Sequence, residues 1–146
     1  MKLLHFYRVA NYLHRKKIPI LPKLIYYAQF YIFNSSIPST VKIGKNTIFA
    51  YGGIGTVIHG EAVIGDNCVI GQGITIGGKS KIYKFPVIGN NVYIGAGARI
   101  LGPVVIGDDV VIGPNTVVVK NVESNTIVVG IPAKVLKTGI KMRDYV

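Results

Sequence analysis

Histidine is the side chain of this sequence best suited to proton transfer, because its pKa lies close to neutral pH. A base of this kind can take the proton of a hydroxyl group, which is otherwise a poor nucleophile. The chain of 146 residues contains three histidines, His5, His14 and His59. Only His59 stands among the repeats described below, directly after Ile58, where most repeats carry Gly. We therefore predict that His59 projects outward from a corner as a general base. The alternative is a surface histidine at a turn.

Two other kinds of chemistry are disfavoured. Cys68 is the single cysteine of the chain and occupies a repeat position otherwise filled by Ala, Val, Ile or Thr, so we expect it in the core rather than as a nucleophile. One cysteine forms no internal disulfide, which favours a reducing compartment. A three-histidine metal site, as in the γ-class carbonic anhydrases, needs more ligands than the one histidine of the repeats. No metal is therefore expected.

Aliphatic side chains recur every six residues along most of the chain. One series is Ile58, Ile64, Ile70, Ile76, Ile88, Ile94, Ile100, Ile106, Ile112 and Val118. A second series of small or aliphatic residues follows four positions later: Ala62, Cys68, Ile74, Val92, Ala98, Val104, Val110, Thr116 and Val122. This period fits neither a helix stripe nor an alternating strand. With Gly, Asn, Asp and Pro between the apolar residues, it predicts short strands joined by tight turns, wound into an all-β solenoid that is a parallel β-helix.

The sequence divides into three predicted regions. Residues 1–40 form a basic helical region, residues 41–137 the β-helix, and residues 138–146 a C-terminal tail. Within the first region we expect helices over 2–17 and 22–34, since prolines interrupt the apolar pattern between them.

The repeat period is broken at two places. Phe49 and Ile58 are nine residues apart instead of six, which indicates an insertion of three residues. Residues 77–86 are too polar and too basic to be core. We expect this segment to leave the solenoid as a loop, where functional residues tend to gather.

The net charge of +11 is concentrated near the N-terminus, where residues 1–40 carry no acidic side chain. Such a surface fits an anionic neighbour, either membrane headgroups, nucleotide phosphates or an acidic glycan. No nucleic-acid-binding module is recognisable, so nucleic acid is not expected as a partner. The apolar run at residues 24–33 is too short to span a bilayer. The two helices either pack on the solenoid or a neighbouring subunit, or rest on a membrane surface. We expect a cytoplasmic protein, with the inner face of the membrane as the surface in the second case.

Four stretches together resemble the hexapeptide-repeat acyltransferases, in the same order along the chain: 77–80 (GGKS), 94–102 (IGAGARILG), 117–122 (VVVKNV) and 128–135 (VVGIPAKV). The branch they most resemble is the serine-acetyltransferase-like group, which includes sugar and capsular O-acetyltransferases. The resemblance implies a left-handed β-helix and a homotrimer. It also implies that acetyl-CoA is the co-substrate and lies in a groove between two subunits.

The resemblance also implies which residues contact the cofactor. They are Gly78, Ala96, Pro114, Val119, Lys120, Lys134 and Lys137. The three lysines would face phosphate groups as point charges, and Gly78 would let the thioester approach closely. A backbone amide of Gly77 or Gly78 is a candidate oxyanion donor. For each lysine, the alternative is a solvated surface charge.

The chain departs from the serine acetyltransferase pattern at three positions. The catalytic His of those enzymes falls at Gly52, a substrate-binding His at Phe85, and the Asp that pairs with the catalytic His near Ser36. His59 is thus a displaced candidate, whose second nitrogen could be held by a backbone carbonyl, Asn34 or Ser36. These departures favour O-acetylation of a sugar or cell-surface polysaccharide. The alternatives are serine O-acetylation and a non-catalytic solenoid.

Overall fold

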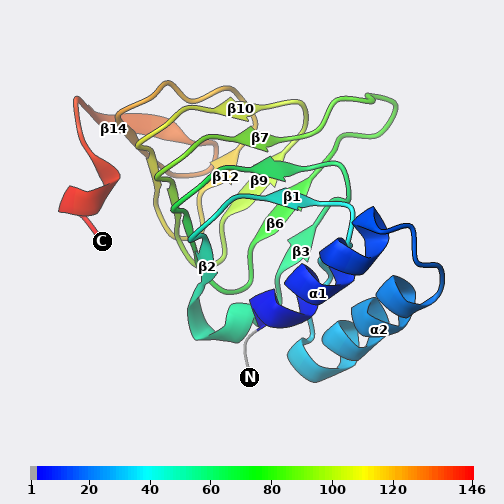
Figure 1. Cartoon of the computed structure of the whole chain (residues 1–146). Helices are drawn as coiled ribbons and strands as arrows, with labels where there is room; N and C mark the ends of the chain where they lie inside the picture. Colours follow the sequence, from blue (N-terminus) through cyan, green and yellow to red (C-terminus); the bar gives the residue numbers. More distant parts are fainter. Residues whose placement is uncertain (1–2) are drawn as a thin grey trace.

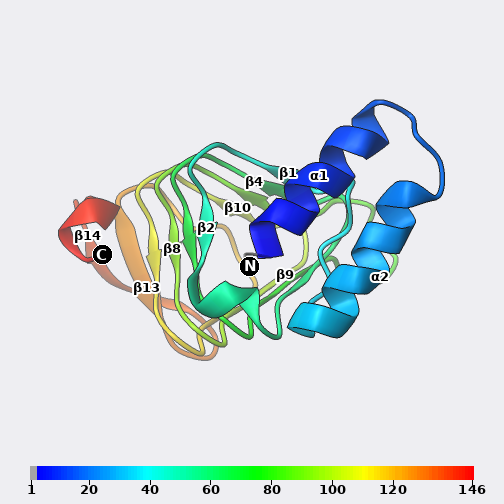
Figure 2. The same ribbon diagram turned by 60° about the horizontal axis from the view of Figure 1, so that its bottom comes forward.

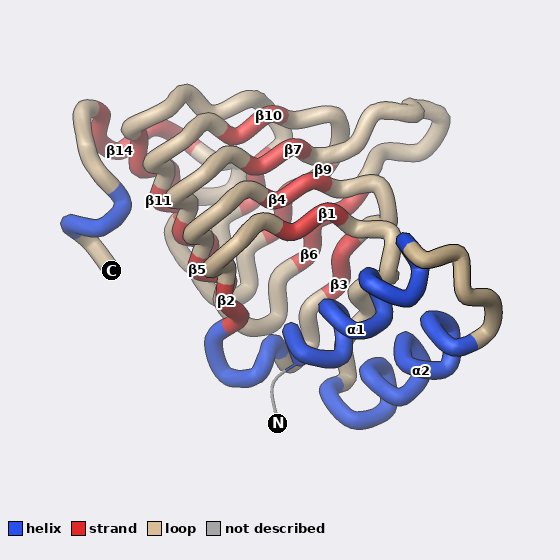
Figure 3. The backbone as a smooth tube through the Cα atoms, viewed as in Figure 1, coloured by secondary structure: helices blue, strands red, loops and turns tan. Residues whose placement is uncertain are grey.

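A computed structural model describes residues 3–146. Strands of two to five residues form three sheets, and the strands pair in parallel except at the C-terminal end (Figures 1 and 3). The β1 sheet contains β1 (Lys42–Ile43), β4 (Val63–Ile64), β7 (Val87–Ile88) and β10 (Val105–Ile106). The β2 sheet contains β2 (Ile48–Phe49), β5 (Val69–Ile70), β8 (Tyr93–Ile94), β11 (Val111–Ile112), β13 (Thr126–Val129) and β14 (Lys134–Thr138). The β3 sheet contains β3 (Val57–Ile58), β6 (Thr75–Gly77), β9 (Arg99–Leu101) and β12 (Val117–Val118). Successive strands pass from one sheet to the next, so the chain winds into a three-sided solenoid.

Both predicted aliphatic series point inward. Ile70, Ile76, Ile94 and Ile100 have no exposed surface, and the second series is buried along its length. Parallel pairing stacks equivalent residues of successive coils, for example Ile70 on Ile94. The other residue of each strand faces outward, because successive side chains of a strand alternate. The core prediction is confirmed, including buried Cys68.

Coil length varies where the period was predicted to break. Lys42 pairs with Val63, 21 residues later, whereas Val87 pairs with Val105, 18 residues later. The three extra residues of the longer coil fall at the short 3-10 helix η1 (Ala50–Gly53). Val63 pairs with Val87, 24 residues later, because the segment 77–86 projects from the solenoid. Both the insertion and the loop are confirmed.

One corner of the solenoid is built from a ladder of Asn and Asp residues in left-handed conformation. Its members, with φ between 53° and 59°, are Asn46, Asn67, Asn91, Asp109 and Asn125. The Asn46 amide donates to Asn67 at 3.2 Å, and Asn67 donates to Asn91 at 3.3 Å. Asn and Asp tolerate positive φ better than other residues with a side chain, so this composition is what the turn requires.

Helix α1 (Leu3–Arg15) lies across the N-terminal end of the solenoid, and α2 (Leu21–Phe33) lies beside α1 (Figures 1 and 2). The predicted helices, 2–17 and 22–34, are confirmed with small shifts of their ends over the described residues, and residue 2 lies outside these. The Tyr7 hydroxyl donates to the Val41 carbonyl at 2.5 Å, and the Asn11 amide donates to the Ser39 carbonyl at 2.8 Å. Arg8 donates to the carbonyls of Ile43 and Gly44. Side chains of α1 thus donate hydrogen bonds to the backbone carbonyls at the open edge of the first coil.

The solenoid begins before the predicted residue 41. Ser36 forms a parallel bridge with Val57, and Ile37 is buried in the core. The apolar pattern concealed this start because Pro38 interrupts it. Among residues 3–146, no helix is both long and apolar enough to cross a bilayer.

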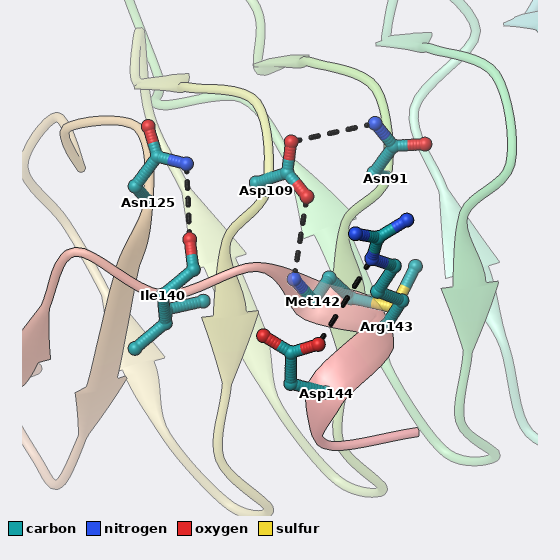
Figure 4. A network of polar contacts seen from close by, with 7 residues as sticks. All are labelled: Asn91, Asp109, Asn125, Ile140, Met142, Arg143 and Asp144. Atoms are coloured by element: carbon teal, nitrogen blue, oxygen red, sulfur yellow. Dashed lines mark hydrogen bonds and ion pairs between the residues drawn. The ribbon is translucent and has the colours of Figure 1, made fainter.

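The C-terminal end reverses direction. β14 pairs antiparallel with β13, and the tail then folds back over the outer side of the β2 sheet (Figures 1 and 4). Ile140 and Met142 are buried there against Val111 and Ile127. The Asn125 amide donates to the Ile140 carbonyl at 2.9 Å. A short 3-10 helix, η2 (Met142–Asp144), ends the tail.

Candidate active site

His59 lies at the corner that follows β3, on the solvent side as predicted. Its ring stacks on Phe85, with 4.1 Å between centroids and 11° between the ring planes. Phe85 comes from the 77–86 loop, one coil further along the chain. The His59 amide donates to the Ile76 carbonyl at 2.8 Å, which sets Gly77 and Gly78 directly beside it.

One hydrogen bond of the His59 ring indicates which ring nitrogen acts as the acceptor. Nδ1 accepts the backbone N–H of Glu61 at 3.2 Å. A nitrogen that accepts a hydrogen bond carries no proton, so in this orientation Nε2 carries the proton of the neutral ring. The Ser36 hydroxyl instead shares a hydrogen bond with Tyr26 at 2.7 Å. Neither of the two side chains considered as partners of the His59 ring, Ser36 and Asn34, forms a hydrogen bond with it within the described residues.

The 77–86 loop forms one wall of a groove next to this corner. The groove has a volume of about 610 Å³ and is lined by Gly78, Lys79, Ser80, Ile82, Leu101, Gly102, Pro103 and Val119. A Cβ at Gly78 would come 3.0 Å from two atoms of the Phe85 ring. Glycine at 78 therefore lets Phe85 lie flat between the loop and His59.

A second groove continues along the same edge towards the C-terminus. Its volume is about 460 Å³, and Val119, Lys120, Pro132, Ala133 and Lys134 are among its lining residues. Val119 lines both grooves. The structure thus brings Gly78, Val119, Lys120 and Lys134 to one edge of the solenoid together with His59.

Three predicted cofactor residues lie elsewhere. Ala96 and Pro114 follow β8 and β11, at the corner between the β2 and β3 sheets, where the backbone N–H of Asn115 donates to the Ala96 carbonyl at 2.8 Å. Within one chain, this is a different edge from that of His59. The Lys137 ammonium donates to the Tyr145 hydroxyl at 2.9 Å, and this hydrogen bond raises the pKa of Lys137. Lys137 is not among the residues that line either groove.

Sequence reasoning missed several residues of the grooves. Lys79 and Leu101 line the first groove, and Phe85 supports the His59 ring. Lys79 and Leu101 lie inside the recognised motifs, but their common wall depends on loop 77–86 folding back on the next coil. A spacing pattern contains no signal for that contact.

Neither Cys68 nor a metal cluster adds to this site. Burial raises the pKa of the Cys68 thiol, which donates to the Gly89 carbonyl at 3.3 Å. A raised pKa keeps the thiol protonated, and the thiolate is the nucleophilic form. Among residues 3–146, no group of three or more His, Cys, Asp or Glu residues is placed to hold a metal ion.

Comparison with known proteins supports the reading of the repeats. Residues 85–120 match the family described as bacterial transferase hexapeptide (six repeats). A serine acetyltransferase of Synechococcus elongatus is 37% identical over 139 residues, which are 93% of this chain and 57% of that protein. A serine acetyltransferase of Staphylococcus epidermidis is 40% identical over 131 residues, covering 88% of this chain and 61% of that protein.

Solved structures agree. The structure of a Brucella abortus serine acetyltransferase in complex with coenzyme A superposes with a TM-score of 0.88 at 30% identity, covering 94% of this chain and 56% of that one. A Neisseria gonorrhoeae serine acetyltransferase gives a TM-score of 0.89 at 31% identity, with 95% and 55% coverage. The predicted left-handed β-helix of hexapeptide repeats is confirmed. The chain spans a little more than half the length of these relatives, none of which is a sugar O-acetyltransferase.

Proposed function

We propose that this chain, which carries the hexapeptide repeats of the bacterial transferases, moves an acetyl group from acetyl-CoA to a hydroxyl group, with L-serine as the first acceptor to consider. The observation that carries the proposal is that Gly78, Val119, Lys120 and Lys134 line two grooves along the edge of the solenoid on which His59 also lies. The similarity to serine acetyltransferases, one of them solved with coenzyme A, supports both the donor and the acceptor.

This edge carries cations that could bind the phosphate groups of acetyl-CoA and a glycine beside the position of its thioester. Lys120 and Lys134 are exposed cations at the C-terminal groove and would attract phosphate groups. Gly78 has no side chain to block a thioester that approaches His59, and the amide of Gly77 or Gly78 could donate to the oxyanion.

His59 would act as the general base. It takes the proton of the acceptor hydroxyl while that oxygen attacks the thioester carbonyl, and the C–S bond then breaks so that coenzyme A leaves with a proton. In the orientation observed, Nδ1 holds the lone pair. Nδ1 would therefore exchange the Glu61 N–H for the acceptor hydroxyl. The stack on Phe85 keeps the ring plane fixed during that exchange.

A sugar hydroxyl is the second candidate acceptor. The observation in its favour is that Phe85 stands where the resemblance places a substrate-binding His, and Gly52 where it places the catalytic His. The phenyl ring of Phe85 has no nitrogen and cannot form the hydrogen bonds to a free amino acid that an imidazole forms. The relatives found nevertheless favour serine, so the sugar becomes the alternative.

In an oligomer, the edge that carries Ala96 and Pro114 would lie against the His59 edge of a neighbouring protomer and complete its site. Because those residues lie on a different edge of the same chain, one protomer alone cannot place them against His59. We therefore propose a homotrimer in which each groove is completed by the next subunit.

The test is thiol release from acetyl-CoA with L-serine and with a panel of sugars. Loss of a general base typically lowers turnover about 10²- to 10⁴-fold, and we expect this of His59→Ala. His14→Ala is the matched control, because His14 is also exposed but lies in α1. Unchanged turnover in His59→Ala would exclude His59 as the base. Binding of coenzyme A without turnover on any acceptor would favour a binding solenoid.

A further inference from the structure

The outer face of α2 is apolar although it faces solvent. Tyr31 is 82% exposed, Leu24 57% and Ile32 54%. We define the α2 outer face as the exposed large apolar residues of this helix and the residue before it: Ile20, Leu21, Leu24, Tyr27, Phe30, Tyr31 and Ile32.

This arrangement is the reverse of an ordinary surface helix, which turns its polar side to water. The inward side of α2 holds Pro22, Gln29 and Phe33, which are buried, and Gln29 uses its amide to bond the Ile37 carbonyl at 2.9 Å. At 100° per residue, the outer face covers the opposite side of the helix, and Lys23 is the one charged residue of α2. Figure 2 shows α2 beside α1 at the edge of the molecule, and the exposure of these side chains means that no element within residues 3–146 covers this face.

The charges around the face are all positive. Arg15, Lys16 and Lys17 at the end of α1 are exposed, as is Lys23. All six acidic residues of the chain lie at position 61 or later. Arg8 is excluded from this set because its guanidinium bonds the carbonyls of Ile43 and Gly44.

We infer that the α2 outer face docks on an anionic lipid bilayer, with α2 lying in the plane of the membrane surface. A helix with an apolar and aromatic side next to Lys and Arg binds such surfaces by burying the apolar side chains among the headgroups, while the cations attract anionic lipid. A second copy of the chain fits this face poorly, because it would bring two sets of like charges together. This docking surface is separate from the proposed transfer reaction, and neither depends on the other.

The experiment measures partition of the whole chain onto vesicles by sedimentation. One set of vesicles is phosphatidylcholine with roughly 30% phosphatidylglycerol, and the other is phosphatidylcholine alone. The variant Leu24→Glu/Tyr31→Glu removes two apolar contacts. Tyr83→Glu/Leu136→Glu is the matched control, because it makes the same charge change at residues that are 92% and 66% exposed but lie far along the chain from α2. Circular dichroism confirms that each variant keeps its fold.

We expect wild type and control to bind anionic vesicles at least about tenfold more tightly than neutral ones, and salt at about 0.5 M to weaken that binding. Leu24→Glu/Tyr31→Glu should lower partition by at least about tenfold. Equal binding by this variant and wild type would overturn the inference, as would absence of wild-type binding. If the variant instead has a smaller mass by light scattering with no change in partition, the face is a contact between copies and the inference is wrong.

Discussion

Single glycines fix how closely the coils approach. A Cβ at Gly95 would lie 2.5 Å from the backbone nitrogen of Pro114 and 2.8 Å from the carbonyl carbon of Gly113, so two backbones would have to separate. A Cβ at Gly77 would meet its nearest atom, on Leu101, at 3.6 Å, which is ordinary contact. Both glycines follow an inward isoleucine, yet only Gly95 lies where a Cβ would overlap the backbone of the next coil.

We predict that Gly95→Ala lowers the free energy of unfolding by about 1–3 kcal/mol, the usual cost of overpacking. Gly77→Ala should change it by less than about 0.5 kcal/mol, because nothing needs to move. Thermal or denaturant unfolding of the two variants beside wild type measures the difference. Equal stability of both variants would show that the coils can move apart at Gly95 without cost.

Residue identity in the core could be read from the sequence, but contacts of the site could not. Ile70 and Ile94 are predicted as inward neighbours because a period fixes their positions. The stack of His59 on Phe85 joins residues 26 positions apart across a loop outside the period. The Glu61 bond to Nδ1 depends on the local backbone of one turn, which side-chain spacing does not describe.

At the scale of elements, the C-terminal tail is held by few interactions. Ile140 and Met142 are its buried side chains, and Asp109 accepts the Met142 amide at 3.3 Å (Figure 4). The same Asp109 accepts from Asn91 at 3.5 Å, so the corner ladder ends by binding the tail. The sequence predicted a tail but not that it packs on the β2 sheet, because Ile140 and Met142 lie outside the six-residue repeat and no spacing pattern indicates their neighbours.

We predict that Ile140→Ala releases the tail without unfolding the solenoid. Loss of about 2 kcal/mol of burial corresponds to a roughly 30-fold larger open population. Limited trypsin digestion should then cut faster after Lys141 and Arg143. Val146→Ala, at an exposed position of the same tail, is the control and should digest like wild type. Equal digestion of all three proteins would show that Ile140 does not hold the segment.

At the scale of the molecule, the proposed site needs two protomers. Light scattering should give three times the 15.8 kDa of the chain. His59→Ala and Ala96→Trp should each abolish transfer, the first by removing the base and the second by filling the opposite wall. Mixed oligomers of the two variants should regain part of the activity, because some grooves combine the intact His59 edge of one chain with the intact Ala96 edge of another. Absence of recovery in mixed oligomers of native mass would place the whole site within one chain.

The overall winding was within reach of the sequence, whereas the distribution of residues over its three edges was not. Six-residue spacing identifies a coil, but it does not tell whether Lys120 and Pro114 share an edge. That depends on how many strands make up one coil: Pro114 follows β11 and Lys120 follows β12, and these two strands belong to different sheets.

The bonds of Tyr7, Arg8 and Asn11 to the first coil have a consequence for solubility. A stack of parallel strands can in principle grow without limit, because each exposed rim is a template for another chain. Here the rim carbonyls of Val41, Ile43 and Gly44 already accept hydrogen bonds from the side chains of α1, and at the opposite rim the β2 sheet ends in the antiparallel strand β14. Fibril growth by end-to-end addition is therefore blocked at the starting rim and discouraged at the finishing one.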